Sequence, residues 1–253
     1  MTKRKKLLLI IIPLCLLALC AAGLGIYYAN WGSVSIDRTD MMAAGRFNGM
    51  PYRIYMPQGE GPFPLVLYLH GAGERGDNNR AQTKKNSVMQ TLLSEENLEK
   101  YPCIVLAPQC PKNGWWDAEV LMDLLGAKIL AAHQVDFKRI YITGLSMGGF
   151  GTWNMLGEYP NYFAAAVPVC GGGDTDSVPL FKHIPIWAFH GTLDTVVFPS
   201  GSRDMVTALA RAGARDVHYT EYPDLAHNSW DRAYREPGLF PWMFAQVREA
   251  QIN

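Results

Sequence analysis

The sequence predicts one α/β domain, in which a mostly parallel β-sheet is covered by helices on both faces. From about residue 40 onward, short apolar runs alternate with segments of helical periodicity. The run from Leu65 to Leu69 is continuously apolar, which is typical of a parallel strand buried on both faces. With 253 residues, of which 49% are hydrophobic, the chain is long enough to fill one core of this kind.

Seven strands and five helices follow from this alternation. The strands are expected at 52–56, 65–69, 104–107, 140–143, 165–169, 186–189 and 217–222. The helices are expected at 87–100, 118–133, 147–159, 200–212 and 241–251, and Ser200 is the candidate N-cap of the fourth, which ends before Gly213. Strands that alternate with helices favour parallel crossover connections. No large insertion separates residues 143 and 194, so we expect a minimal cap domain or none.

The first 28 residues have the pattern of an export signal. Residues 3–6 supply four positive charges, and residues 7–28 carry no charge. This pattern predicts either a signal peptide cleaved near residues 21–23 or an uncleaved membrane anchor, since about 20 apolar residues span a bilayer. Either alternative places the remainder of the chain outside the cytoplasm. We therefore divide the chain into a leader (1–28), a linker (29–40) and a catalytic domain (41–253).

Charge and cysteine content argue against two classes of protein. Apart from residues 3–6, 19 basic residues stand against 23 acidic ones, so no surface for nucleic acid is expected. No Cys/His spacing resembles a metal site, and no cofactor is predicted. In an oxidising compartment Cys103 and Cys110 could form a disulfide, while a buried thiol in an apolar strand suits Cys103 equally well.

The stretch Gly-Leu-Ser-Met-Gly at 144–148 is the most informative part of the sequence. A predicted strand ends at Thr143 and a predicted helix starts near Met147, so Ser146 lies in a tight strand-to-helix turn. Gly144 and Gly148 remove the side chains that would clash across such a turn. The following amide, that of Met147, lies at a helix N-terminus, where free N–H groups and the helix dipole stabilise an oxyanion. The pattern predicts that Ser146 is a nucleophile.

A serine hydroxyl needs a neighbouring base, and that base needs an acid to orient it. His227 is the candidate base, because it stands in a loop after the last strand, where it can reach the carboxyl edge of the sheet. The other histidines downstream of Ser146 are less suited, since they precede a strand, end one or lie within one: His183, His190 and His218.

Asp194 is the candidate acid, because it follows the strand 186–189 at the same edge of the sheet as Ser146. Asp174 and Asp176 follow the preceding strand and are the main competitors, although a solvated Gly/Asp turn also explains them. Asp224 is only three residues from His227, which is too close for an independent loop. The expected chain order is therefore Ser146, Asp194, His227.

A second oxyanion donor is expected from the loop after the strand 65–69. Gly71 and Gly73 let the chain turn there, so that a backbone N–H can face the serine. Ala72 is the residue whose amide we assign to this role, together with that of Met147. His70 is expected to hold the loop through structural hydrogen bonds and not to transfer protons.

Three tryptophans lie near the expected site. Trp115 and Trp116 follow the strand 104–107, and Trp230 is close to His227. They could line a pocket for an acyl or aromatic group, or they could simply pack the loops in place.

With these motifs the chain resembles the α/β-hydrolases. Ser146, Asp194 and His227, together with HGAGERGDN at 70–78, are similar to the esterase or "predicted peptidase" branch near the phospholipase/carboxylesterases, feruloyl esterases and polyhydroxybutyrate-depolymerase-like enzymes. The resemblance covers residues 49 to 227. It implies hydrolysis of a carboxylic ester, small or attached to a polymer, through an acyl-enzyme without a cofactor. Membrane contact would come only through an uncleaved leader.

Three alternatives remain at this point. A serine peptidase of the prolyl-oligopeptidase type shares the three residues, but usually carries a large gating domain for which this sequence leaves no room. A non-catalytic binding protein on the same fold commonly lacks one of the three residues. Acyl transfer to an alcohol would use the same acyl-enzyme.

Overall fold

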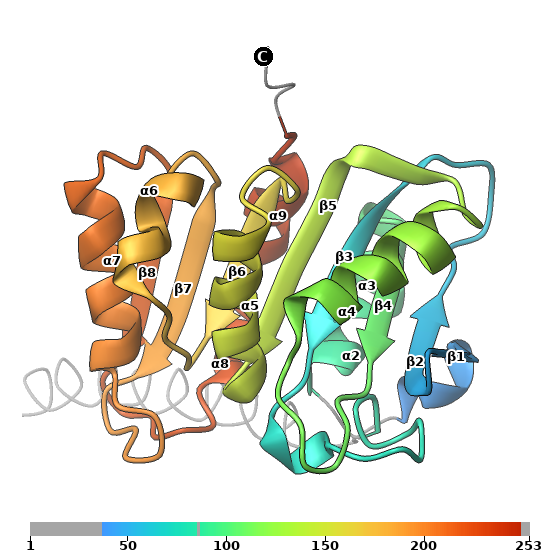
Figure 1. Cartoon of the computed structure of the whole chain (residues 1–253), viewed down its shortest axis with the longest axis horizontal. Helices are drawn as coiled ribbons and strands as arrows, with labels where there is room; N and C mark the ends of the chain where they lie inside the picture. Colours follow the sequence, from blue (N-terminus) through green and yellow to red (C-terminus); the bar gives the residue numbers. More distant parts are fainter. Residues whose placement is uncertain (1–36, 85–86, 249–253) are drawn as a thin grey trace, which may run out of the picture. The chain divides into compact units, whose positions relative to one another are not determined.

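A computed structural model of the chain describes residues 37–84 and 87–248 (Figure 1). The described residues belong to one compact unit that begins at Asp37. The predicted leader, 1–28, lies outside the described residues, as does most of the predicted linker. Thr39, near the end of the predicted linker, is buried, and its hydroxyl lies 2.8 Å from that of Thr83. Among the described residues, no helix is both long and apolar enough to cross a membrane.

One eight-stranded sheet organises the described part of the chain. Its strands are β1 (Ala43–Phe47), β2 (Met50–Tyr55), β3 (Phe63–Leu69), β4 (Ile104–Pro108), β5 (Val135–Leu145), β6 (Ala165–Val169), β7 (Ile186–Gly191) and β8 (Val217–Tyr222), in the order β1-β2-β4-β3-β5-β6-β7-β8. From β4 to β8 all neighbours are parallel, while β1 and β2 form an antiparallel edge. All seven predicted strands are present. β1 is an addition, paired to β2 through the turn at Asn48 and Gly49, both with positive φ.

Successive side chains along a strand point to opposite faces of the sheet, and each face has its own hydrophobic core. On β3, Leu65, Leu67 and Leu69 belong to the core that also contains buried residues of α4 (Ala118–Asp123), α5 (Met147–Glu158), α6 (Val178–Phe181) and α7 (Ser200–Arg211). Val66 and Tyr68 pack on the opposite face against α2 (Ser87–Leu92), α8 (Trp230–Ala233) and α9 (Leu239–Ala245). Figure 1 shows α4 to α7 in front of the sheet and the other group behind it. The doubly covered parallel sheet is the predicted fold class.

The predicted helices differ from the observed ones mainly where a polar cap interrupts the pattern. The range 87–100 divides into α2 and α3 (Glu95–Lys100), because the Ser94 side chain accepts from the Asn97 amide and starts a new helix. The range 118–133 becomes α4 followed by a π-helical segment, η3 (Leu124–Leu130). Three short 3-10 segments complete the list: η1 (Arg38–Met41), η2 (Ala72–Glu74) and η4 (Thr175–Ser177).

One expectation about a helix cap is wrong, and the structure decides between the two alternatives for Cys103. Ser200 is not the N-cap of α7 but its first residue, because Pro199 occupies the cap position and offers no side chain that could accept a hydrogen bond. The three cysteines of the described residues, Cys103, Cys110 and Cys170, are all buried and free. The buried-thiol alternative is therefore the correct one for Cys103, whose side chain packs into the core behind the sheet.

Candidate active site

Ser146 lies in the sharp turn between β5 and α5, as the pattern predicts. Its backbone has φ +53° and ψ −117°, a conformation that non-glycine residues rarely adopt. The turn is held by the Ser146 amide, which donates to Val169 O at 3.0 Å and lies 3.3 Å from Cys170 Sγ. The strained turn thus presents the hydroxyl at the carboxyl edge of the parallel strands.

The two glycines of the motif allow three backbone segments to meet at this turn. A Cβ on Gly144 would overlap the carbonyl of Gly148, and one on Gly148 would overlap the carbonyl of Leu69 at the end of β3. No side chain can therefore be added without moving either the turn or the neighbouring strand. The spacing of glycines around Ser146 is a requirement of packing.

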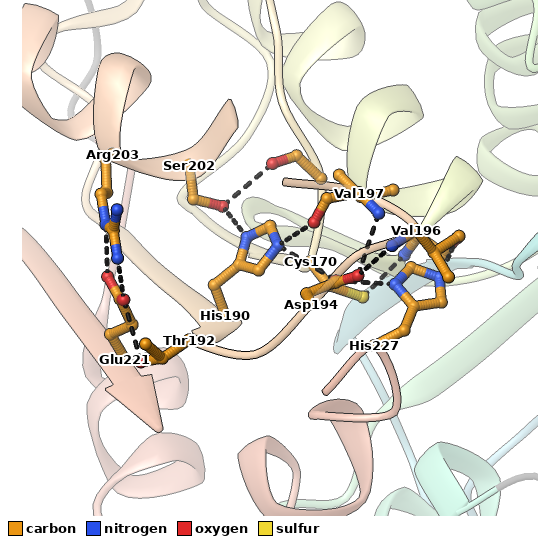
Figure 2. Close-up of polar contacts among 12 residues, drawn as sticks. Cys170, His190, Thr192, Asp194, Val196, Val197, Ser202, Arg203, Glu221 and His227 are labelled. Atoms are coloured by element: carbon orange, nitrogen blue, oxygen red, sulfur yellow. Dashed lines mark hydrogen bonds and ion pairs between the residues drawn. The ribbon is translucent and has the colours of Figure 1, made fainter. Parts of the chain in front are cut away.

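Ser146, His227 and Asp194 form a continuous hydrogen-bonded chain. The Ser146 hydroxyl donates to His227 Nε2 at 2.9 Å. His227 Nδ1 donates to Asp194 Oδ2 at 2.7 Å, and Figure 2 shows these two side chains in contact. Ser146 follows β5, Asp194 follows β7 and His227 follows β8, so three strand ends at one edge of the sheet supply the three side chains. Of the competing acids, Asp174 is used elsewhere: its Oδ1 accepts from the Asp176 amide and caps η4.

Asp194 remains ionised although it is buried. Burial opposes the charge, but hydrogen bonds from His227 and from the backbone amides of Val197 and Val196 outweigh this effect and hold the pKa of Asp194 below its usual value. Both amides donate to Oδ1 at 2.9 Å, which leaves Oδ2 for His227. A charged acid in this position stabilises an imidazolium on His227 and fixes its tautomer.

The two amides predicted as oxyanion donors lie in segments that meet at Ser146. Met147 is the first residue of α5, where the helix itself provides no acceptor for the N–H. Gly71, which precedes Ala72, is close enough that a Cβ there would lie 3.6 Å from Ser146 Cβ. Arg75 connects the two segments, because its Nε donates to Met147 Sδ at 3.1 Å. The arrangement suits an anion that forms beside the Ser146 hydroxyl.

His70 anchors the loop that carries Ala72. Its Nδ1 lies 2.6 Å from Gly71 O, and its Nε2 accepts from the Cys110 amide at 2.9 Å. Burial lowers the pKa of His70 to about 4, so the ring is neutral at pH 7. These contacts give the histidine a structural position, as expected from the sequence.

Beside Met147 lies an open cavity of about 580 Å³. Its aromatic and apolar lining comes from connections that follow different strands: Trp115, Trp116, Met147, Phe150, Trp153 and Leu180. Trp115 is 60% exposed, whereas Trp116 is half-buried and donates its Nε1–H to His70 O at 3.2 Å. Trp116 thus packs the loop and also lines the cavity, and a role of these tryptophans in substrate binding stays a prediction.

Trp230 has a different position from the other two tryptophans. Its ring meets that of His227 edge-on, with centroids 5.4 Å apart, and it is not part of the cavity lining. Phe150, Trp153 and Leu180 were missed by the sequence. Phe150 could have been found, because it lies in the first turn of the helix that follows the nucleophile motif.

One group of potential metal ligands occurs among the described residues. The Cys170 Sγ atom, a carboxylate oxygen of Asp194 and a ring nitrogen of His227 lie within 4.8 Å of one another. The His227 and Asp194 atoms are already joined by a hydrogen bond, and burial raises the pKa of the Cys170 thiol to about 12. A protonated thiol is a poor metal ligand. These three side chains are therefore better suited to the hydrogen bonds they make than to binding a metal ion.

A hydrogen-bonded Ser–His–Asp chain on this sheet, with the serine on a strand-to-helix elbow, defines an α/β-hydrolase. A family model described as the prolyl oligopeptidase family matches residues 114–188. The bifunctional acetylxylan esterase/xylanase of Neocallimastix patriciarum is 28% identical over 201 residues, which make up 77% of this chain and 28% of that protein. The poly(3-hydroxyoctanoate) depolymerase of Pseudomonas fluorescens is 30% identical over 176 residues, 59% of this chain and 62% of that protein.

Among solved structures, a thermostable esterase matches with a TM-score of 0.79 and 38% identity, over 83% of this chain and 64% of that one. The chain spans less than two thirds of the length of each of these three relatives. The fold is that of the α/β-hydrolases, and the chain is similar in sequence to esterases.

Proposed function

We propose that the protein is a serine hydrolase that cleaves carboxylic esters through an acyl-enzyme intermediate. The observation that carries the proposal is the hydrogen-bonded chain from the Ser146 hydroxyl through His227 to the buried carboxylate of Asp194. Because Ser146 is held at φ +53° at the edge of the sheet, its hydroxyl can approach an acyl carbon without movement of the backbone. The esterase relatives support the same reaction class.

In the first half of the reaction, His227 Nε2 takes the hydroxyl proton while Ser146 Oγ attacks the acyl carbon. The carbonyl oxygen becomes an oxyanion, which accepts hydrogen bonds from the amides of Ala72 and Met147. Asp194 stabilises the imidazolium, which then gives its proton to the leaving alcohol. In the second half, water loses a proton to His227 and attacks the acyl-enzyme, and the acid product leaves as Ser146 regains its proton.

The open cavity beside Met147 is the proposed site of the acyl group. Trp115 and Phe150 offer exposed ring surface there, and Trp116 forms part of the wall. Trp230 would instead hold the His227 ring in orientation by edge-on packing. An open cavity without a cap suits a bulky acyl group or one that is attached to a polymer. The names of two relatives, an acetylxylan esterase and a poly(3-hydroxyoctanoate) depolymerase, are consistent with an ester on a polymer.

The decisive test uses p-nitrophenyl acetate and butyrate with purified protein. We expect Ser146→Ala to lower kcat by at least about 10⁴-fold without changing the thermal unfolding midpoint. Ser200→Ala removes an exposed hydroxyl at the start of α7 and serves as the matched control. A fluorophosphonate probe should label the wild type and the Ser200→Ala variant, but not Ser146→Ala. Esterase activity retained by Ser146→Ala would sink the assignment, and a wild type that is neither active nor labelled would favour a binding protein.

Peptide hydrolysis is the second candidate, because the matching family model is that of the prolyl oligopeptidases. Amides have a poorer leaving group, so the two activities are separated by comparing matched p-nitroanilide and p-nitrophenyl substrates with the same acyl group. We expect ester turnover to exceed amide turnover. The reverse preference would favour the peptidase, and products formed with added alcohols would reveal acyl transfer.

We also propose that the catalytic domain acts outside the cytoplasm. The support is the cluster of four basic residues at 3–6, followed by the uncharged run 7–28. N-terminal sequencing of the exported protein distinguishes a cleaved signal from an anchor. Recovery of the full-length protein only from the cytoplasm would contradict the proposal.

A further inference from the structure

A second histidine contacts the proposed catalytic carboxylate. His190 is the last residue but one of β7 and is fully buried, and its Nε2 lies 3.2 Å from Asp194 Oδ2. The same oxygen accepts the 2.7 Å hydrogen bond from His227 Nδ1. Figure 2 shows the two rings on opposite sides of Asp194. Oδ2 is therefore shared between two imidazoles.

The neighbours of His190 determine where its ring proton lies. Nε2 faces Val197 O at 2.9 Å as well as the Asp194 carboxylate, and both groups can only accept hydrogen bonds. A proton on Nε2 is therefore required, since two acceptors would otherwise face a lone pair. Nδ1 lies 2.8 Å from Ser202 Oγ, a hydroxyl that can donate to it.

The charge of the ring follows from its surroundings. Burial lowers the pKa of His190, and this effect exceeds the opposing influence of its hydrogen bond to Val197 O and of the acids Asp194 and Glu221. Glu221 is itself paired with Arg203 at the surface. His190 is thus a neutral ring with the proton on Nε2. The single proton of the Ser202 hydroxyl can be donated either to Nδ1 at 2.8 Å or to the carbonyl of Gly171 at 2.9 Å.

With this tautomer, N–H groups surround the Asp194 carboxylate. The amides of Val196 and Val197 donate to Oδ1, and His227 Nδ1 donates to Oδ2. The Nε2–H of His190 donates to Val197 O and lies beside the same Oδ2, with Nε2 3.2 Å from it. The backbone amides fix the position of the carboxylate group. The positive end of the Nε2–H dipole beside Oδ2 stabilises the negative charge on the oxygen that faces His227, so it makes that oxygen a weaker acceptor.

We propose that His190 is a positioning residue that acts through Asp194. Its Nε2–H holds Oδ2 in place and moderates the basicity of His227, the group that removes the serine proton in the function proposed above. Through Ser202 on α7 and Gly171 after β6, the same ring connects the loop of Asp194 to two neighbouring elements. The role is distinct from that of Ser146, Asp194 and His227, because His190 has no contact with the serine.

The first test needs no activity. In wild-type protein labelled with ¹⁵N-histidine, the two-bond ¹H–¹⁵N correlations of each imidazole identify the protonated nitrogen, and loss of one ring pattern in His190→Gln assigns the signals. We expect a neutral ring protonated on Nε2 between pH 6 and pH 8, a range around the ordinary histidine pKa of about 6.5. A ring protonated on Nδ1 would overturn the proposal.

The second test compares two variants of similar size. His190→Gln keeps an N–H donor near the position of Nε2, whereas His190→Phe keeps a ring without a donor. With p-nitrophenyl acetate, we expect kcat/KM of the Phe variant to fall by about 10- to 100-fold, as for other groups that orient an active-site residue. The acid limb of its kcat/KM profile should also move to higher pH, by about half a unit. The Gln variant should keep kcat/KM within about threefold.

A purely structural role makes a different pattern. Equal losses in the Gln and Phe variants, with no movement of the acid limb, would contradict the proposal. If His190→Phe fails to fold, the Gln variant and the wild-type spectra still decide. A wild type without any ester turnover would refute the proposed function, and the ring tautomer would still report on the contact between His190 and Asp194.

Discussion

His70 shows how one buried side chain makes stability depend on pH. Its folded pKa is lowered to about 4 by burial, whereas an unfolded histidine titrates near 6.5. The unfolded chain therefore binds a proton between these values that the folded chain does not. The stabilisation is fully present above pH 6.5 and is lost as the pH falls toward 4, by up to about 3 kcal/mol.

The prediction is tested by urea unfolding of the wild type and His70→Gln at pH 7.0, 5.5 and 4.5. We expect the variant to be less stable at pH 7.0, because the hydrogen bonds to Gly71 O and the Cys110 amide are perturbed. It should also lose less stability on acidification than the wild type. Parallel pH dependences of the two proteins would show that His70 does not titrate in this range.

At the same scale, the three side chains joined at the site were those identified by motif and chain order. Ser146, Asp194 and His227 could be predicted because each follows a strand at the same edge of the sheet. For His190, the sequence indicates only a position at the end of a strand. Its contacts with Asp194 and Ser202 depend on side-chain directions after β7, which spacing along one strand does not reveal.

Between elements, α7 and β8 are joined by an ion pair at the rim of the sheet. Arg203 donates to Glu221, and Tyr219 and Thr192 add hydrogen bonds at 2.8 and 3.0 Å. The hydrogen bond from Arg203 is the main cause that lowers the pKa of Glu221 to about 2. Because the folded pKa is depressed, the stabilisation is present above about pH 4.5 and disappears as the pH falls toward 2.

We expect Glu221→Gln to lower the free energy of unfolding at pH 7 by about 1 kcal/mol, a value reduced for solvent screening because the pair is partly exposed. The loss should vanish near pH 2. Asp224→Asn is the control, since the Arg232–Asp224 pair is exposed and is not expected to affect the unfolding midpoint. Equal effects of the two substitutions would show that the Arg203–Glu221 pair contributes no more to stability than the exposed Arg232–Asp224 pair.

Strands were easier to predict than helices for a physical reason. A strand covered on both faces needs a continuous apolar run, and runs of this kind, such as 65–69, 104–107 and 186–189, all form strands. β1 lacks that signature, since its burial is low and it depends on pairing with β2. α6 and α8 have four residues each, too few for a helical repeat, and their positions depend on packing against the sheet.

For the whole molecule, the sequence predicted the sheet and the three aligned side chains but not the shape of the cavity. Trp116 lies after β4, Phe150 in α5 and Leu180 in α6, so the cavity is formed by separate connections that meet only in the folded sheet. No local pattern contains this information.

Because Leu180 lies on the rim of the cavity and is 57% exposed, its replacement by a larger side chain should alter substrate choice and not the chemistry. We expect Leu180→Trp to lower kcat/KM for an ester with a bulky aromatic acyl group by about tenfold, the amount that a filled apolar subsite typically costs. Turnover of p-nitrophenyl acetate should stay within about twofold. Val247→Trp, at an exposed position outside the cavity lining, is the matched control. A uniform loss for both esters would mean that the acyl group lies elsewhere, whereas a loss confined to the bulky ester would assign this cavity to it.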